Sequence, residues 1–298
     1  MHLTRKLCIL SIIFCFFLSC NNRRNQHTNS YTDSYGREIK ISNLTKVQRI
    51  ISVAPSMTEL FFLLDNGQSL IARSNYCDYP PEARELPSIG TIIEPNIEYI
   101  LALQPDLVVA SDHFTKENVG KLEQFNIPVY IGKQGENLED FYNIINDMGQ
   151  LINKKERAAE LITEMKTQIS DITKRVQSLN NHPKVYYMIS FGESGDYTAG
   201  KDTFIANLIR IAGGINIADD ANGWAYSREK LFAGNPDLIL ISYKEMETSL
   251  KNDHTYSKLR AVQNNKVYTL TAGTMERPSL RNIDALLELE KLFANTKE

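Results

Sequence analysis

One long helix in the middle of the chain most constrains what this sequence can fold into. Residues 154–179 contain neither glycine nor proline, and their apolar residues recur at steps of three and four. This spacing places an apolar stripe along a helix of about 26 residues, roughly 39 Å long. The stripe consists of Leu161, Ile162, Met165, Ile169, Ile172, Val176 and Leu179. A coiled-coil segment is the alternative, but the run is too short for one to stand alone, so we expect a helix that bridges two lobes.

Strand and helix patterns alternate on both sides of this helix. Short runs rich in isoleucine and valine, typical of buried strands, are each followed by a helical pattern. The predicted strands are 48–54, 70–73, 106–111, 128–131, 184–190, 237–242 and 266–270. The alternation predicts an α/β protein with two Rossmann-like lobes, each with a mostly parallel sheet, joined by one long rigid α-helix. We assign residues 33–152 to the N-terminal lobe, 153–181 to the inter-lobe helix and 182–298 to the C-terminal lobe.

Local signals indicate where several helices begin. Ser56 and Glu59 have the spacing of a capping box, in which a hydroxyl and a carboxylate satisfy the first free N–H groups of a helix. Thr203 and Ser227 are the predicted N-caps of two later helices. We expect the C-terminal helix to begin at Ser279.

The first 19 residues have the pattern of an export signal. Arg5 and Lys6 precede an uncharged apolar run over 7–19, which is shorter than a comfortable bilayer span. The run ends in F-L-S-C, which resembles a bacterial lipobox, so Cys20 is the predicted lipidated first residue of the mature chain. Phe17 stands where leucine is usual, and an uncleaved N-terminal anchor is the alternative. Residues 20–32 lack apolar periodicity and are predicted to form a lipidated tether.

Composition and charge exclude several classes of protein. Hydrophobic residues make up 42% and charged residues 23% of the chain, which excludes collagen-like, disordered and coiled-coil proteins. The net charge of −3 disfavours a non-specific nucleic-acid binder, which usually carries a basic surplus. Four cysteines are too few for a disulfide scaffold.

Two segments, one in each predicted lobe, match without a gap. They are 96–111 (NIEYILALQPDLVVAS) and 227–242 (SREKLFAGNPDLILIS), and Glu98 and Glu229 hold equivalent places in them. One interpretation is that the two lobes are similar and carry two equivalent carboxylates. The other is that such helix–Pro-Asp–strand units recur in α/β proteins, with each glutamate only complementing a first helical turn.

Four segments resemble the substrate-binding proteins of iron-siderophore and cobalamin ABC importers. They are 53–60 (VAPSMTEL), 75–82 (NYCDYPPE), 96–109 (NIEYILALQPDLVV) and 275–281 (MERPSLR). The D-Y-P-P segment is most similar to the cobalamin-binding branch. The resemblance extends from about Ile39 to the C-terminus and implies that the ligand binds in a cleft between the lobes. Open α/β sheets place ligands beyond the carboxyl ends of their strands, which agrees with this location.

The resemblance implies that Tyr76, Tyr197, Trp224 and Arg277 occupy cleft positions of a cobalamin binder. Aromatic rings offer a broad corrin a large contact area, and an arginine fork donates to amide or phosphate oxygens. The alternatives are structural packing for the aromatic residues and a helix-start ion pair for Arg277.

Two sequence features near the predicted cleft argue against ligand contact at their positions. Tyr79, beside two prolines, is predicted to pack in a turn. Residues 88–91 have no aromatic residue where cobalamin binders often carry one, which leaves one face of the cleft less covered.

Glu98 and Glu229 match the acidic residues, one in each lobe, that in this family dock onto arginine pockets of the two permease subunits. Such charges mainly set register and association rate. The implied partners are a corrinoid, an ABC permease dimer with its ATPase and, through the lipid, a membrane. We expect a monomer on the periplasmic side of a bacterial envelope, with no cofactor, bound metal or nucleic-acid partner.

Rival ligands share this fold. A ferric siderophore would favour basic side chains around an anionic chelate, which Lys201, Arg277 and Arg281 allow, although the aromatic count favours cobalamin. A haem binder needs an axial ligand, for which Tyr197 or His113 is available. A zinc or manganese site needs three or four histidine and carboxylate ligands, for which the histidines are too few and too scattered.

An enzyme is the rival from a different class of function. Ser56 has no G-x-S-x-G context, and the segment 192–195 (GESG) is not a phosphate-binding loop. Asp112–His113 would supply a base without an obvious nucleophile. The sequence therefore predicts a lipid-anchored, non-enzymatic solute-binding protein that delivers cobalamin, or else a ferric siderophore or haem, to an ABC importer.

Overall fold

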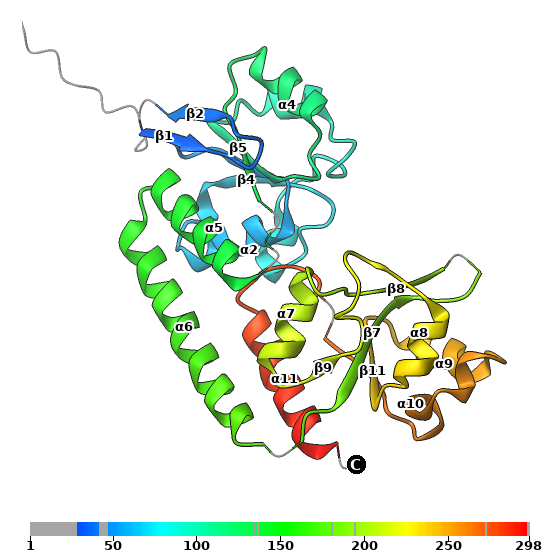
Figure 1. Cartoon of the computed structure of the whole chain (residues 1–298). Helices are drawn as coiled ribbons and strands as arrows, with labels where there is room; N and C mark the ends of the chain where they lie inside the picture. The colour runs from blue at the N-terminus through cyan, green and yellow to red at the C-terminus, as the bar shows by residue number, and fades with distance from the viewer. Residues whose placement is uncertain are drawn as a thin grey trace, which may run out of the picture.

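Two α/β lobes lie one above the other and share a long helix along one side (Figure 1). This computed structural model describes residues 29–41, 47–133, 135, 137–179, 181–193, 195–271 and 273–296. The predicted signal, Cys20 and most of the predicted tether lie outside the described residues. The end of the tether prediction is wrong, because Asn29–Thr32 forms strand β1 and pairs with β2 (Glu38–Ile41) in an antiparallel hairpin.

The N-terminal lobe is built on a four-stranded sheet in the order β4-β3-β5-β6, and every pairing in it is parallel. The strands are β3 (Ile50–Ser52), β4 (Leu70–Arg73), β5 (Leu107–Ser111) and β6 (Val129–Gly132). The helices are α2 (Pro55–Leu63), α3 (Ile97–Ala102), α4 (Lys116–Glu123) and α5 (Leu138–Leu151). Buried apolar clusters cover both faces of the sheet, which explains why its strands are continuous apolar runs.

The C-terminal lobe has a six-stranded sheet in the order β10-β8-β7-β11-β12, with β9 also paired to β7. Its strands are β7 (Lys184–Ser190), β8 (Asp196–Thr198), β9 (Ile215–Asn216), β10 (Ala225–Tyr226), β11 (Leu238–Ile241) and β12 (Val267–Thr269). Its helices are α7 (Phe204–Ile211), α8 (Arg228–Gly234), α9 (Lys244–Asn252), α10 (Arg260–Gln263) and α11 (Asn282–Asn295). The pairings among β9, β7, β11 and β12 are parallel, and β8 and β10 add an antiparallel edge.

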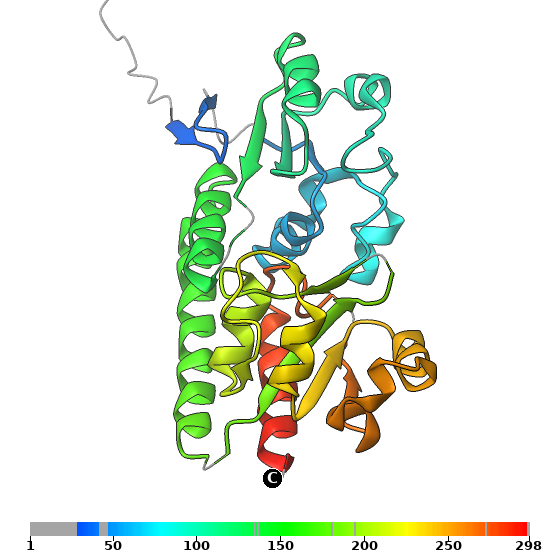
Figure 2. The same cartoon turned by 45° about the vertical axis from the view of Figure 1, so that its right-hand side comes forward.

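Helix α6 (Lys155–Gln177) bridges the lobes, as the turned view of Figure 2 also shows. It packs against α5 of the N-terminal lobe and against α7 and α11 of the C-terminal lobe. Its predicted apolar stripe is buried at Leu161, Met165, Ile172 and Val176, within one core cluster that reaches both lobes. The helix is shorter than predicted. At its end the Ser178 hydroxyl donates to the carbonyl of Arg175 in the last turn, and this bond competes with further helical hydrogen bonds.

Within the described residues, no helix is both long and apolar enough to cross a bilayer.

Two helix-start predictions are wrong. Ser56 and Glu59 form no capping box, because α2 begins earlier, with Ala54 as its N-cap and Pro55 in its first turn. The C-terminal helix begins at Asn282 rather than Ser279, and the Ser279 N–H donates to the side-chain oxygen of Asn282 instead. The predicted caps Thr203 and Ser227 are confirmed, since each side chain accepts from the backbone N–H three residues later.

The matching segments 96–111 and 227–242 have the same local structure in both lobes. Asn96 and Ser227 cap their helices, and Gln104 and Asn235 both adopt a positive φ just before the proline. The aspartate after each proline accepts from backbone N–H groups that lead into the neighbouring strand. The two lobes therefore share one structural unit, with β5 and β11 each flanked by two parallel strands.

Candidate ligand-binding cleft

Two hollows lie at the boundary between the lobes. One, of about 160 Å³, sits at the carboxyl ends of β3, β5 and β6 and is completed from the C-terminal lobe by Arg277 and Pro278. The other, of about 340 Å³, lies between α2, the Tyr79–Pro80 turn and the start of α11. Strand ends and a lobe boundary are both places where α/β proteins bind small molecules, so we take these hollows as the floor of the candidate cleft.

The loop that carries Arg277 is held by the strands of its own lobe. Glu276 Oε1 accepts hydrogen bonds from the Tyr187 hydroxyl (2.7 Å) on β7 and from Ser242 Oγ (2.6 Å) just after β11. Burial raises the pKa of Tyr187 further above its ordinary value, so the phenol stays a neutral donor. Buried Asn282 donates to the carbonyls of Thr274 (2.6 Å) and Arg277 (3.0 Å), which closes the loop from the other end.

Two arginines of this loop reach across to two carboxylates of the N-terminal lobe. Arg281 donates from Nη2 to Glu59 Oε1 (3.0 Å) and from Nε to Glu59 Oε2 (3.2 Å), which is a bidentate pair. Arg277 donates from Nη2 to Asp78 Oδ1 (3.2 Å), and its Nε lies 3.6 Å from Glu59 Oε1. We call Glu59, Asp78, Arg277 and Arg281 the cross-lobe cluster; its formal charges cancel.

Glu59 lies at the centre of this cluster and is 3% exposed. Burial raises the pKa of Glu59, while its hydrogen bond from Arg281 and the charges of Arg281 and Arg277 oppose the rise. Sequence reasoning missed this role, because S-x-x-E is also the signature of a capping box. The signal that could have found it is a carboxylate on the inner face of an apolar helix, between buried Leu60 and Met57.

The aromatic residues predicted to bind ligand are exposed in both lobes. Tyr76, in the loop after β4, is 56% exposed and stands two residues before Asp78 of the cross-lobe cluster. Tyr197 (39% exposed) and Trp224 (47% exposed) are brought together by the β8–β10 pairing, in which the Thr198 N–H donates to the Trp224 carbonyl at 2.7 Å. Tyr197 lies on strand β8 and pairs with the last residue of β7. Of the four predicted ligand residues, Arg277 alone lines the 160 Å³ hollow.

Other exposed or hollow-lining residues follow the strands of the two lobes. Tyr243, two residues after β11, is exposed, and an aromatic residue soon after a buried strand is the signal that could have found it. Ile92 lines the smaller hollow and Ile93 is exposed, so apolar side chains follow the stretch 88–91 that lacks an aromatic residue. His113 also lines this hollow, with its Nδ1 3.5 Å from Asp112 Oδ1.

Tyr79 packs at the lobe boundary. The guanidinium carbon of Arg281 lies 4.3 Å from the centre of the Tyr79 ring, a cation–π arrangement. The following bond, Tyr79–Pro80, is cis. This placement fits the predicted packing in a turn and adds that the packing partner comes from the other lobe.

Comparison with known proteins decides the family. Residues 50–274 match the family model described as periplasmic binding protein. The chain belongs to the periplasmic binding protein family. The predicted family and the two-lobed α/β fold are thereby confirmed, and proteins of this family deliver bound substrates to ABC permeases.

Three individual likenesses refine the comparison. The chain is 29% identical over 255 residues to a vitamin B12-binding protein of Vibrio parahaemolyticus, covering 84% of this chain and 91% of the relative. It is 24% identical to an uncharacterized ABC transporter substrate-binding lipoprotein of Bacillus subtilis, covering 89% of this chain and 85% of the relative. A periplasmic heme-binding protein of Roseiflexus in apo form superposes with a TM-score of 0.76 at 25% identity, covering 84% of this chain and 98% of that one.

The two glutamates predicted to dock onto a permease are exposed in this binding protein. Glu98 lies in the first turn of α3 and Glu229 in the first turn of α8. Glu229 accepts a hydrogen bond from Ser227 Oγ at 2.6 Å, which lowers the pKa of Glu229. Among the described residues, neither carboxylate forms an ion pair within 4 Å with a lysine, arginine or histidine nitrogen.

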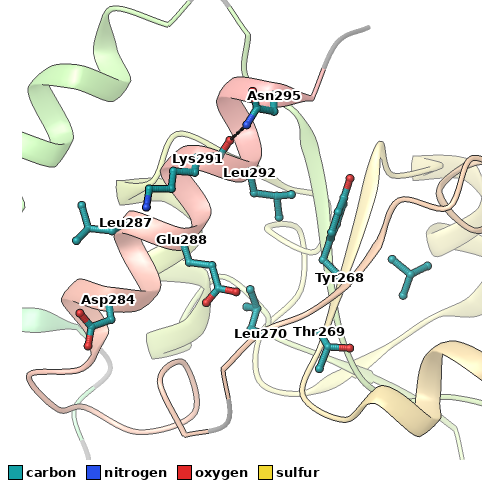
Figure 3. Close-up of a pocket in the computed structure, with 10 residues that line it drawn as sticks. Tyr268, Thr269, Leu270, Asp284, Leu287, Glu288, Lys291, Leu292 and Asn295 are labelled. Carbon is teal, nitrogen blue, oxygen red and sulfur yellow. Dashed lines mark hydrogen bonds between the residues drawn. The ribbon is translucent and has the colours of Figure 1, made fainter.

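A larger hollow of the binding protein lies away from the lobe boundary. It measures about 740 Å³ and lies between edge strand β12 and helix α11 (Figure 3). Tyr268, Leu287 and Leu292 contribute apolar surface, and Glu288 and Lys291 contribute charge. None of the predicted ligand residues lines it, and it belongs to the C-terminal lobe alone. Across the described ranges, no group of three or more histidine, cysteine and carboxylate side chains is placed to hold a metal ion.

Proposed function

We propose that this protein is a lipid-anchored solute-binding protein that captures cobalamin between its lobes and delivers it to an ABC importer. The observation that carries the proposal is a charge-balanced cross-lobe cluster at the cleft floor combined with exposed aromatic rings on both lobes. Cobalamin is a broad, largely uncharged corrin with amide side chains. Aromatic side chains cover such a surface at low entropic cost, and hydrogen-bond donors whose charge is already balanced suit the amide oxygens.

The charge of the cross-lobe cluster disfavours the ferric-siderophore alternative. An anionic chelate is best bound by cations that are free to pair with it. Arg277 and Arg281 are already paired with Asp78 and Glu59, so the cross-lobe cluster offers an anion no net charge. The B12-binding relative named above supports the same choice of ligand.

Haem is the second candidate ligand. The supporting observation is that the phenols of Tyr197, on β8, and Tyr243, two residues after β11, are exposed, as is the imidazole of His113, two residues after β5. Either group is a suitable axial ligand for haem iron. The superposition on an apo heme-binding protein supports this alternative.

The lipid anchor and the importer are supported by separate observations. F-L-S-C at residues 17–20 is a lipobox-like end to the signal, and the Bacillus subtilis relative carries the name lipoprotein. Metabolic labelling with a radioactive fatty acid should label the wild-type protein and not the Cys20→Ser variant. Label retained in that variant would contradict the anchor.

A titration tests the choice of ligand. The full chain, purified from membranes in mild detergent, is titrated with cyanocobalamin by calorimetry, beside haemin and a ferric siderophore. Saturable one-to-one binding of cyanocobalamin, weakened at least about tenfold in Trp224→Ala, is the expected result. The matched control is Phe125→Ala, which removes an exposed ring after α4. Folded protein that binds haemin and not cyanocobalamin would overturn the proposal in favour of the second candidate.

A further inference from the structure

We propose that Glu59 determines the charge class of the ligand: by neutralising Arg277 and Arg281 it keeps the cleft selective for ligands without net negative charge. This inference rests on the proposed function and assigns a specificity role to a buried residue below the protein surface that would contact the ligand. Glu59 is 3% exposed, so it acts through the two arginines.

The first step is the geometry of the shared carboxylate. Glu59 Oε1 is 3.0 Å from Arg281 Nη2 and 3.6 Å from Arg277 Nε, so one oxygen serves both guanidinium groups. Arg277 Nε is buried and has no hydrogen-bond partner. Arg277 is therefore held towards Glu59 by charge rather than by a directional bond.

The second step is where the neutralised charge is located. Arg277 lines the 160 Å³ hollow, and Glu59 and Arg281 line the 340 Å³ hollow. Asp78 is the other carboxylate of the cluster and its side chain is 55% exposed, so solvent screens it more strongly than it screens Glu59. Without the Glu59 charge, two guanidinium groups would face one solvated carboxylate at the cleft floor.

The third step is the effect on ligands. A single uncompensated cation in a partly buried site strengthens binding of an anion through charge-assisted hydrogen bonds, by about tenfold or more. The same change has little effect on a ligand of zero net charge. Loss of Glu59 should therefore widen the specificity of the cleft towards anionic chelates and leave cobalamin binding nearly unchanged.

The test compares Glu59→Gln with the wild type in the full chain, using cyanocobalamin as the neutral probe and ferric dicitrate as the anionic probe. We expect Glu59→Gln to bind ferric dicitrate at least about tenfold more tightly than the wild type does, with the gain shrinking as salt rises. Cyanocobalamin affinity should change by less than about threefold. Glu123→Gln is the matched control, because it removes a carboxylate that pairs with Arg37 in the N-terminal lobe and changes net charge equally.

Two further variants keep the test decisive. Glu59→Asp retains the charge and should keep the ligand preference of the wild type. If its affinity for ferric dicitrate rises as much as that of Glu59→Gln, charge is not the cause and the inference fails. If Glu59→Gln does not fold, Asp78→Asn replaces it in the test. This variant removes one negative charge from the exposed edge of the same cluster and should also increase the affinity for ferric dicitrate. Unchanged ferric dicitrate binding in folded Glu59→Gln, or in Asp78→Asn where that is the variant that folds, would overturn the inference while cobalamin binding stands. If the wild-type protein does not bind cyanocobalamin, the proposed function itself is contradicted.

Discussion

Glu59 and Arg281, 222 positions apart in the chain, form a bidentate ion pair across the boundary between the lobes. Glu59 comes from the first N-terminal-lobe helix after β3, and Arg281 precedes the last helix of the C-terminal lobe. Because each residue is held by its own lobe, this pair and the neighbouring Arg277 set the geometry of the cleft floor from both sides. The pair thus links the stability of the lobe interface to the ligand-binding surface.

The contribution of Glu59 to the stability of the folded protein should depend on pH in a specific direction. Burial raises the pKa of Glu59 above 4.5, so the folded protein binds this proton more tightly than the unfolded chain does. The contribution of Glu59 to the free energy of unfolding should then fall as pH rises from about 4.5 through its raised pKa. Thermal unfolding should show a larger wild-type advantage over Glu59→Gln at about pH 4.5 than at about pH 8. An advantage that grows with rising pH would contradict this.

The other ion pair of interest joins α6 to α11. Arg175 donates to both carboxylate oxygens of Glu290, at 2.6 and 2.8 Å, and this hydrogen bonding lowers the pKa of Glu290. Its stabilisation should be present above about pH 4.5 and lost as pH falls through the lowered pKa. Arg175→Ala should lower the unfolding midpoint slightly at neutral pH, because the arginine is exposed to solvent. Lys174→Ala, which loses only a pair within the same helix, is the control and should have a smaller effect.

The packed face of α6 can be tested with two adjacent residues. Leu161 is fully buried in the core cluster that reaches both lobes, whereas Ile162 is only partly buried. Leu161→Ala should reduce the free energy of unfolding by about 2–5 kcal/mol. Ile162→Ala should cost about 1 kcal/mol. Urea unfolding of both variants measures the difference, and equal costs would show that the buried face is not the one described.

The proposed permease contacts predict a separation of binding from transport. Replacing Glu98 and Glu229 together by alanine should reduce ligand uptake by cells at least about tenfold and leave ligand affinity unchanged, because neither side chain lies in the cleft floor. Glu117 and Glu245 are the matched controls, since each is an exposed glutamate in the first turn of a helix, one in each lobe. Uptake that falls equally in the control double variant would remove the docking role.

Much of the architecture could be predicted because its signals are local. The strand Leu70–Arg73 was expected with the same bounds, and the helix that follows Ser227 was expected from its cap. The repeated segment left open whether the lobes are similar or only share a common helix–Pro-Asp–strand unit, and the structure shows the same local conformation in both, down to a positive φ at Gln104 and at Asn235. Short strands such as β8 and β10 were missed, because two or three residues carry no periodicity and only pairing with a neighbour makes them strands.

The sequence by itself determined the α/β alternation, the bridging helix and the caps at Thr203 and Ser227, since each depends on side chains within a few turns of one another. Only the tertiary structure decided what Glu59 does. Its spacing from Ser56 predicts a cap, but Pro55 shifts the helix start, and burial against Arg281 of the other lobe gives the carboxylate a stronger partner. Charge compensation in a buried site depends on atoms brought together from distant parts of the chain, which no local pattern encodes.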